Sequence, residues 1–172
     1  MYMLSSRNAF TAIPAKAQKE RDIYDPLVSS LNRKTKHKSR CPGIVFRNTS
    51  AYPDHDKKLG SHKPDLCGYA EEHLQFVQVS ESHATAHTDL GYAALFIEVK
   101  PCPELDFFRD PPKDIDANDR ASCKFVLDIG NKGNLEYAEN ALGQNIAYAA
   151  EICARQHRHF AFPYHLLVLW LG

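Results

Sequence analysis

The spacing of apolar residues predicts two helices that each bury one face. The clearer one runs from Leu135 to about His157, where apolar residues recur three and four positions apart. Its predicted buried stripe comprises Ala138, Leu142, Ile146, Ala149, Ile152 and Cys153. A second stripe, made of Ile23, Leu27, Val28 and Leu31, predicts an earlier helix that begins near Ala15 and ends at Asn32.

Short runs rich in β-branched and aromatic residues predict strands between these helices and after them. The strongest is Ala94 to Lys100, and Pro101 should end it because proline has no N–H for a sheet ladder. Three weaker strands are predicted from Gly43 to Val45 or as far as Tyr52, from Pro64 to Ala70, and from His165 to Gly172. The segment from Leu74 to Val79 fits a strand or a short helix equally well.

Two charges close the strongest predicted strand. Side chains alternate along a strand, so Glu98 and Lys100 share one face with Phe96, while Ile97 and Val99 share the other. A carboxylate and an ammonium at the end of a buried strand are costly unless they pair with each other or take part in chemistry. This strand end is therefore the first candidate site.

Composition indicates one ordinary globular domain. The chain has 172 residues and a formal net charge of zero. We expect a mobile lead-in over residues 1–14 and a single α/β domain over 15–172, with a surface insertion near 101–122 that is rich in Asp and Pro. No apolar run approaches the roughly 18 residues of a membrane span, so no membrane partner is expected.

The five cysteines are scattered and show no C-x-x-C spacing. This pattern favours free thiols in a reducing compartment, the cytoplasm or the nucleus. His83 and His87 would align for zinc only on a helix, and a plain polar loop is favoured there.

A basic run near the N-terminus is the strongest charge feature. The first forty residues hold nine Lys or Arg against three Asp or Glu. The run itself contributes Arg33, Lys34, Lys36, Lys38 and Arg40. It reads either as a patch that contacts nucleic-acid phosphates, or a nuclear-import signal, or as a solvated loop tip.

Three short motifs occur in an order that carries a family resemblance. Pro64-Asp65 precedes a short apolar run, Glu98-Val99-Lys100 closes the strongest strand, and Gln144 and Tyr148 lie one turn apart on the long helix. Together they resemble the PD-(D/E)xK nuclease superfamily, and the last element is similar to that of its exonuclease branch. The resemblance implies a restriction-endonuclease-like fold with a mixed central sheet flanked by helices.

The same resemblance implies roles for these residues. Asp65, Glu98 and the main-chain carbonyl of Val99 would hold Mg²⁺ or Mn²⁺, since hard oxygen donors suit these ions. Lys100 would orient or deprotonate the attacking water, while Gln144 and Tyr148 would position the substrate phosphate. Members of the superfamily often open with a helix that bears an acidic residue near the metal, and Glu20 and Asp22 are the candidates here.

A narrower resemblance covers most of the chain. The motifs above, together with Ile23 to Val28 and Gln156-His157-Arg158, look like the region that precedes the kinase lobes of fungal-type protein kinases. The kinase motifs themselves are missing from the sequence, so no kinase activity is expected. In those proteins the chain continues beyond the last strand, so we expect a fold truncated at that point.

Two functions remain open from the sequence. The first is metal-dependent hydrolysis of phosphodiester bonds in DNA or RNA. The second is a non-catalytic regulatory module that docks on a kinase domain or another protein, in which Glu98 and Lys100 form an ion pair and Asp65 caps a turn.

Overall fold

The described part of the chain forms a four-stranded sheet with helices on both faces. The computed structural model describes residues 9–14, 17–34, 38–51, 62–77, 88–101, 108, 111–112, 114–124, 130–161 and 163–167. The elements in chain order are α1 (Arg21–Leu31), β1 (Ile44–Asn48), β2 (Leu66–Ala70), the 3₁₀ turn η2 (Glu71–His73), α2 (Leu74–Val77), β3 (Ala93–Lys100), α3 (Ala117–Arg120), α4 (Lys132–Gln156) and β4 (Pro163–Leu167).

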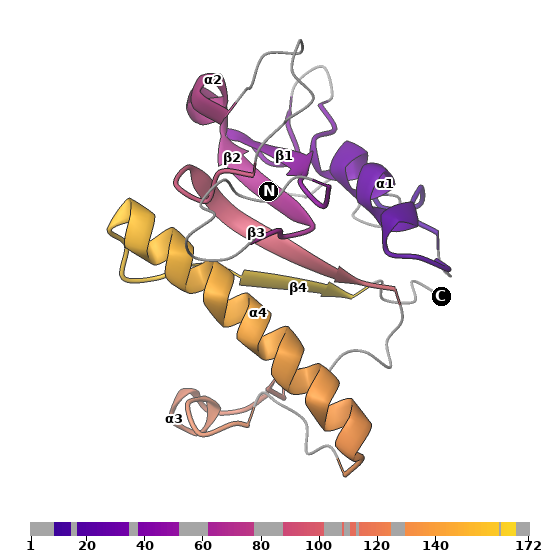
Figure 1. Ribbon diagram of the computed structural model, residues 1–172, viewed down its shortest axis with the longest axis vertical. Helices are drawn as coiled ribbons and strands as arrows, with labels where there is room; N and C mark the ends of the chain where they lie inside the picture. The colour runs from indigo at the N-terminus through magenta and orange to yellow at the C-terminus, as the bar shows by residue number, and fades with distance from the viewer. Residues whose placement is uncertain are drawn as a thin grey trace.

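The sheet is mixed, as the sequence predicted. Strands β1, β2 and β3 form an antiparallel meander, and β4 pairs in parallel with β3 after the chain has passed through α4 (Figure 1). The strand order follows the chain order, β1-β2-β3-β4. The predicted α/β fold with a mixed central sheet flanked by helices is therefore confirmed. None of the described helices is both long enough and apolar enough to cross a bilayer.

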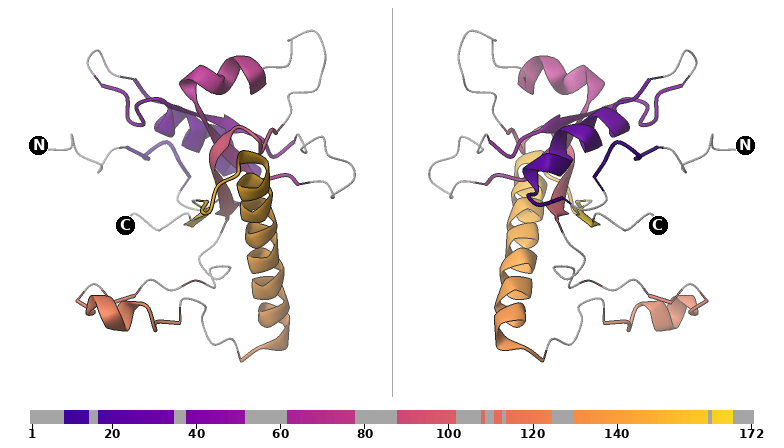
Figure 2. Two further views of the ribbon diagram at one scale, coloured as in Figure 1. Left: turned by 90° about the vertical axis from the view of Figure 1, so that its left-hand side faces the viewer. Right: turned by 90° about the vertical axis from the view of Figure 1, so that its right-hand side faces the viewer.

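Each face of the sheet packs against one helix (Figure 2). On one face, α1 contributes to a cluster that includes Leu66 and Ile97. On the other face, the C-terminal half of α4 packs on Cys67 and Phe96, the neighbours of those residues in sequence. Consecutive strand residues thus point to opposite cores, and each large apolar side chain buried there stabilises the fold by about 1.5–3 kcal/mol.

The central strand β3 matches its prediction closely. It ends at Lys100, directly before Pro101. Ile97 and Val99 belong to the core under α1, whereas Phe96 belongs to the core under α4. The division of the strand into two faces is therefore confirmed.

Helix α1 begins later than predicted. It starts at Arg21 rather than near Ala15, because the Asp22 carboxylate accepts the Lys19 main-chain N–H and closes a turn just before the helix. It ends at Leu31, and Asn32 closes it as predicted. The Asn32 side chain also bonds both main-chain groups of Phe46, which joins the end of α1 to β1.

The described part of the predicted lead-in lies on the domain. Phe10 and Ile13 pack against the core under α1. The Arg40 guanidinium lies over the Phe10 ring and donates to the Ala9 carbonyl.

Helix α4 differs from its prediction at its start and in its buried face. It begins at Lys132 instead of Leu135, because the Asn131 side chain accepts the N–H groups of Gly133 and Asn134 and caps the helix there. Its buried residues are Ala138, Ala141, Asn145, Tyr148 and Ile152. Ile146, predicted to be buried, is 58% exposed. Small alanines and a tyrosine that packs on Phe96 occupy the inner face, whereas Ile146 lies outside it.

Other predicted segments are only partly described. The first strand spans Ile44–Asn48, and the ambiguous segment at 74–77 is helical as α2. In the predicted insertion, the described residues include the exposed helix α3. The loop with His83 and His87 and residues 168–172 of the last predicted strand lie outside the described residues.

Replacing two glycines, one at a time, by alanine should change the free energy of unfolding in opposite directions. A Cβ at Gly68, in the middle of β2, would lie 3.2 Å from side-chain atoms of Ile44, Phe46 and Leu95, whereas a Cβ at Gly143 meets nothing within 4 Å. We expect Gly68→Ala to lower the free energy of unfolding by about 1–3 kcal/mol through overpacking. Gly143→Ala, in the interior of α4, should raise it by roughly 0.5–1 kcal/mol.

Urea denaturation followed by circular dichroism measures both changes. A Gly68→Ala protein as stable as wild type would show that the packing around β2 is looser than described.

Candidate active site at the end of the central strand

Asp65 ties together three elements at the point where the β2–β3 ladder ends. It directly precedes β2, and the last residue pair of the ladder is Leu66 with Ile97. Beyond that pair, the main-chain N–H of Val99 donates to Asp65 Oδ2 over 2.9 Å. The Tyr24 hydroxyl, from α1, donates to Asp65 Oδ1 over 2.6 Å. The carboxylate therefore replaces a strand partner for β3 and anchors α1 to the sheet.

Glu98 and Lys100 lie next to this anchor. The Glu98 residue is 4% exposed, and its Oε1 accepts from Lys100 Nζ at 2.9 Å. Within the described residues, Glu98 Oε2 has no hydrogen-bond partner although it is buried. Lys100 also lies 3.7 Å from Glu20, the residue just before α1. The strand end thus concentrates carboxylates around one ammonium.

The ionisation of Glu98 reflects this crowding. Burial, followed by repulsion from Asp65, raises the pKa of Glu98 to about 7, although Lys100 acts in the opposite direction. Burial alone would lower the pKa of Lys100, but the charge and hydrogen bond of Glu98, with Glu20 and Asp65, leave that pKa above its ordinary value. Lys100 therefore keeps its proton at neutral pH, while Glu98 changes charge near it.

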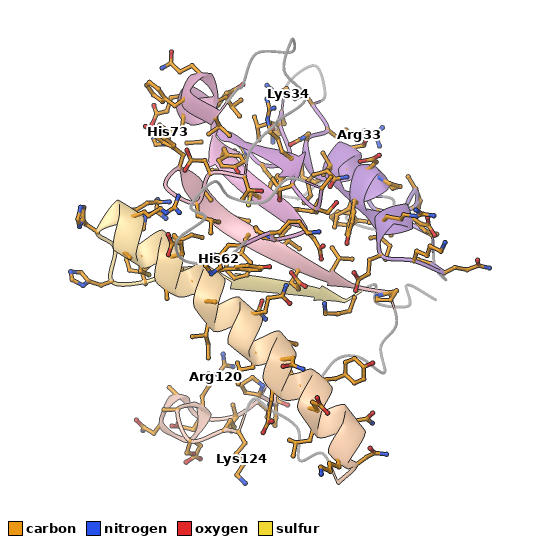
Figure 3. All side chains as sticks on the ribbon, viewed as in Figure 1. Arg33, Lys34, His62, His73, Arg120 and Lys124 are labelled. Atoms are coloured by element: carbon orange, nitrogen blue, oxygen red, sulfur yellow. The ribbon has the colours of Figure 1, made fainter. Side chains whose placement is uncertain are left out.

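Helix α4 places the aromatic ring of Tyr148 beside the same end of β3. Tyr148 is buried, and its ring meets Phe96 of β3 edge to face, with ring centroids 5.3 Å apart. Burial raises the pKa of Tyr148 to about 12, and the charges of Glu98 and Asp65 act in the same direction. Gln144 donates from its side-chain amide to the Tyr148 hydroxyl over 2.7 Å. His62, three residues before Asp65, meets the Tyr148 ring edge to face, with ring centroids 5.8 Å apart (Figure 3 labels His62).

The structure therefore gathers the main predicted site residues. Asp65, Glu98 and Lys100 meet at the end of β3, and Tyr148 is close enough for the charges of both carboxylates to affect it. Val99 belongs to the same group through its N–H. Because the N–H and C=O of a strand residue face the same neighbouring strand, its carbonyl faces the edge at which Asp65 lies.

Of the two acidic candidates before and in α1, only one belongs to the site. Glu20 lies beside Lys100 and 3.4 Å from the Tyr24 hydroxyl. Asp22 instead accepts the Lys19 N–H.

The predicted basic patch lies elsewhere. Lys34 pairs with Glu71 at 3.0 Å, and Glu71 follows β2 at the end opposite to Asp65. The five residues of β2 place this pair about 20 Å from Asp65. In Figure 3, Arg33 and Lys34 lie on the side of the molecule away from His62. Arg40 donates to main-chain carbonyls, including that of Ser30, and Lys36 lies outside the described residues.

Sequence patterns alone did not single out Tyr24 and His62. Tyr24 lies among the apolar positions of α1, where its side chain is buried. A buried tyrosine hydroxyl needs a polar partner. The position of Tyr24 on the apolar stripe could therefore have indicated a buried polar contact. His62 had no such signal, because its place depends on how α4 packs on the sheet.

The oxygen atoms at this strand end suit a hard divalent ion that binds few carboxylates and keeps several waters. Among the described residues, no three His, Cys, Asp or Glu side chains converge as a metal-binding group. Mg²⁺ typically needs only one or two protein carboxylates and retains several waters. The buried Oε2 of Glu98 is an acceptor without a protein donor in the described residues, and Asp65 adds lone pairs on both of its oxygens. This donor set fits such an ion.

Comparisons with protein-family models, with curated proteins and with solved structures found no match to this chain.

The Tyr24–Asp65 hydrogen bond predicts a measurable loss of stability. Tyr24→Phe removes a donor from a buried carboxylate while keeping the ring in the core, so we expect the free energy of unfolding to fall by about 1.5–3 kcal/mol. Tyr137→Phe is the matched control, because Tyr137 is 65% exposed and should give no change. Urea denaturation compares the two. Equal stability of both variants would show that Tyr24 does not anchor α1.

The raised pKa of Glu98 predicts an unusual dependence of stability on pH. Below its unfolded pKa of 4.5, Glu98 is protonated in both states and costs nothing. Above its folded pKa of about 7, folding must bury a charge, so this contribution to stability is lost as pH rises. Glu98→Gln does not titrate. The variant should therefore gain stability relative to wild type between pH 5 and pH 9, by on the order of 2–3 kcal/mol.

The control for this titration is Glu72→Gln, because the Glu72 side chain is 83% exposed. Its stability difference from wild type at each pH is the reference for that of Glu98→Gln. A Glu98→Gln difference that follows the same course would mean that burial does not change the ionisation of Glu98.

Proposed function

We propose that this chain is a metal-dependent nuclease-like domain that hydrolyses phosphodiester bonds of DNA or RNA. The observation that carries the proposal is the meeting of Asp65, Glu98 and Lys100 at one end of β3, although Asp65 is distant from the other two in sequence. The order of these residues is that of the PD-(D/E)xK motif, and the mixed sheet with flanking helices is compatible with it.

The ion would be held by Asp65, Glu98 and the carbonyl of Val99. When bound, Mg²⁺ or Mn²⁺ would lower the pKa of a coordinated water and offset negative charge on the scissile phosphate. The buried free oxygen of Glu98 supports this assignment, since a bound cation would relieve an otherwise unfavourable position.

Lys100 would act through its charge. Since its pKa lies above the ordinary value, it keeps its proton at neutral pH and is poorly suited to remove one. It would hold the attacking water or the phosphate by hydrogen bonds from its ammonium group. Glu20 and Glu98 would hold Lys100 in place.

Gln144 and Tyr148 would form the side of the site that the substrate contacts. Gln144 is exposed, and its amide is already directed by the bond to the Tyr148 hydroxyl. It would donate to a phosphate oxygen, while Tyr148 fixes its position.

The basic run would contact the substrate at a distance from the reaction. About 20 Å separates the Lys34–Glu71 pair from Asp65, which is the length of about six nucleotides of a duplex strand. Arg33, Lys34 and Lys38 would contact backbone phosphates there, which adds affinity but no sequence preference. Arg40 instead donates to main-chain carbonyls and would hold the run in place.

The second candidate is a non-catalytic regulatory module of the kind that precedes fungal-type kinase lobes. One observation favours it: Lys100 already neutralises Glu98, and both oxygens of Asp65 already accept hydrogen bonds. In this reading the polar cluster stabilises the fold and does no chemistry. Among the described residues, Cys41, Cys67, Cys123 and Cys153 form no disulfide, which supports a cytoplasmic or nuclear location in either case.

Cleavage of nucleic acid tests the first proposal. Purified protein with Mn²⁺ should nick supercoiled plasmid DNA or cut a labelled RNA. Lys100→Ala should reduce cleavage at least a hundredfold. Lys132→Ala, which removes an exposed lysine at the start of α4, should cleave like wild type. Circular dichroism checks that each variant is folded. Equal cleavage by Lys100→Ala would assign the activity to a contaminant.

Thermal melting separates the two candidate functions without relying on turnover. Mn²⁺ should raise the melting temperature of wild type at pH 8, and less so at pH 6, where protons compete for Glu98. Asp65→Asn should lose most of the shift. A protein with neither a metal-induced shift nor cleavage would favour the regulatory module.

A further inference from the structure

Arg47, in β1, carries a buried N–H group that has no acceptor among the described residues. The donor atom is Nε of its guanidinium group, although the residue as a whole is only half-buried. A buried donor without a partner is unfavourable, and an ordered water or a bound ion is the usual explanation. Because arginine keeps its positive charge at any physiological pH, an anion would satisfy this group best.

The Arg47 side chain lies on the face of the sheet that packs against α4. Its two neighbours in β1 face α1: Phe46 belongs to the core under α1, and Asn48 donates to the Asp25 carboxylate of that helix. Side chains alternate along a strand, so Arg47 points to the opposite face. There it is paired across the ladder with Cys67, which belongs to the core under α4. In the described part of the chain, no β1 residue belongs to that core, so Arg47 lies at its margin.

Arg47 is close to the candidate active site. Asp65 lies two residues before Cys67 in the chain, so it is the diagonal neighbour of Arg47. Diagonal neighbours on antiparallel strands are about 7–8 Å apart, which is within reach of a long side chain. Both oxygens of Asp65 are instead occupied by donors from α1 and β3. The buried Nε of Arg47 and the buried Oε2 of Glu98 therefore lie on one face of the sheet, the first a donor and the second an acceptor, and neither has a partner among the described residues.

We propose that Arg47 binds a backbone phosphate of the nucleic-acid substrate, close to the scissile phosphate. The class of ligand rests on the proposed nuclease function. A guanidinium group can bind a phosphate through two parallel hydrogen bonds, so Arg47 would fix the position of the substrate strand. The strand register puts the Cα atoms of Arg47 and Glu98 roughly 12 Å apart, which is the axial rise of three to four nucleotides. The phosphate bound by Arg47 would therefore be at most a few nucleotides from the scissile one.

The strand β1 also connects Arg47 to the basic run. Gly43, directly before β1, accepts the main-chain N–H of Glu71, and Glu71 pairs with Lys34. The basic run therefore lies at the first end of β1 and Asp65 lies near its last end, with Arg47 between them. In the described sheet β1 is an edge strand. A nucleic-acid strand that follows this edge would meet positive charge on its way to the candidate active site.

Binding of fluorescein-labelled oligonucleotides in EDTA tests this proposal separately from cleavage. Fluorescence anisotropy measures the Kd for single-stranded DNA, RNA and duplex DNA over a series of salt concentrations. Arg47→Met removes the charge and keeps an apolar stem. We expect it to weaken binding at least tenfold and to lower the slope of log K against log salt by about one. Arg120→Met is the matched control, because it removes the same charge from an exposed residue on α3, away from the sheet (Figure 3), and it should bind like wild type.

The stability of the same variant separates a ligand-binding role from a structural one. Because Arg47→Met removes a buried donor that has no acceptor among the described residues, the free energy of unfolding should stay the same or rise. An arginine that holds the fold together would instead lose stability on this change. Urea denaturation measures the difference. Arg47→Lys should restore part of the lost binding, because it returns the charge without the two parallel hydrogen bonds.

The proposal fails if wild type binds oligonucleotides and Arg47→Met binds them as tightly as Arg120→Met, and this result leaves the nuclease function open. It also fails if Arg47→Met unfolds more easily than wild type and Arg47→Lys restores stability and binding together, which would make Arg47 structural. A melting temperature that inorganic phosphate raises in wild type but not in Arg47→Met, without any oligonucleotide binding, would show a site for a small anion instead. A protein that binds oligonucleotides through Arg47 but never cleaves them would support the phosphate site and contradict the nuclease function alone.

Discussion

The buried carboxylate of Asp65 is the interaction on which the polar end of this domain depends. The β2–β3 ladder stops at Leu66, and the strand β3 continues past it. Without Asp65, the N–H of Val99 would be left unpaired in a buried position. The same carboxylate accepts the Tyr24 hydroxyl, so one side chain holds the end of β3 and the position of α1 together. This double use explains why α1, β2 and β3 meet where Glu98 and Lys100 are placed.

That anchor sets the electrostatics of its surroundings. Glu98 is brought into a buried position beside a second carboxylate, and its pKa rises accordingly. The positive charge of Lys100 offsets part of the cost of burying Glu98, and Lys100 also pairs with Glu20. A cluster kept only for stability would be better replaced by apolar residues of similar size. A cluster that binds a cation or a phosphate needs its charges. The cost of burying Glu98 is therefore the physical reason for preferring a functional reading.

The sheet separates the two halves of the molecule. On one side, α1 and the core beneath it hold Asp65 and Glu20 in place. On the other side, α4 supplies Tyr148 and Gln144, and His62 packs on the Tyr148 ring. Because the C-terminal half of α4 packs on the sheet and its N-terminal half runs beyond it (Figures 1 and 2), the helix presents one face to the site and another to solvent.

Much of this arrangement was determined by the sequence alone. The alternation in β3, its end before Pro101, the existence of both helices and the α/β class follow from local patterns, because side-chain periodicity and proline chemistry act over a few residues. The mixed sheet did not follow from these patterns and was expected only from the family resemblance. The motif order predicted that Asp65, Glu98 and Lys100 would belong to one site. The tertiary structure decided which face of α4 is buried, because close packing against Phe96 favoured Tyr148 and small residues over the more apolar Ile146. It also decided the roles of Tyr24, Glu20 and His62, since each depends on a partner from another element, and such contacts leave no periodic pattern in the chain.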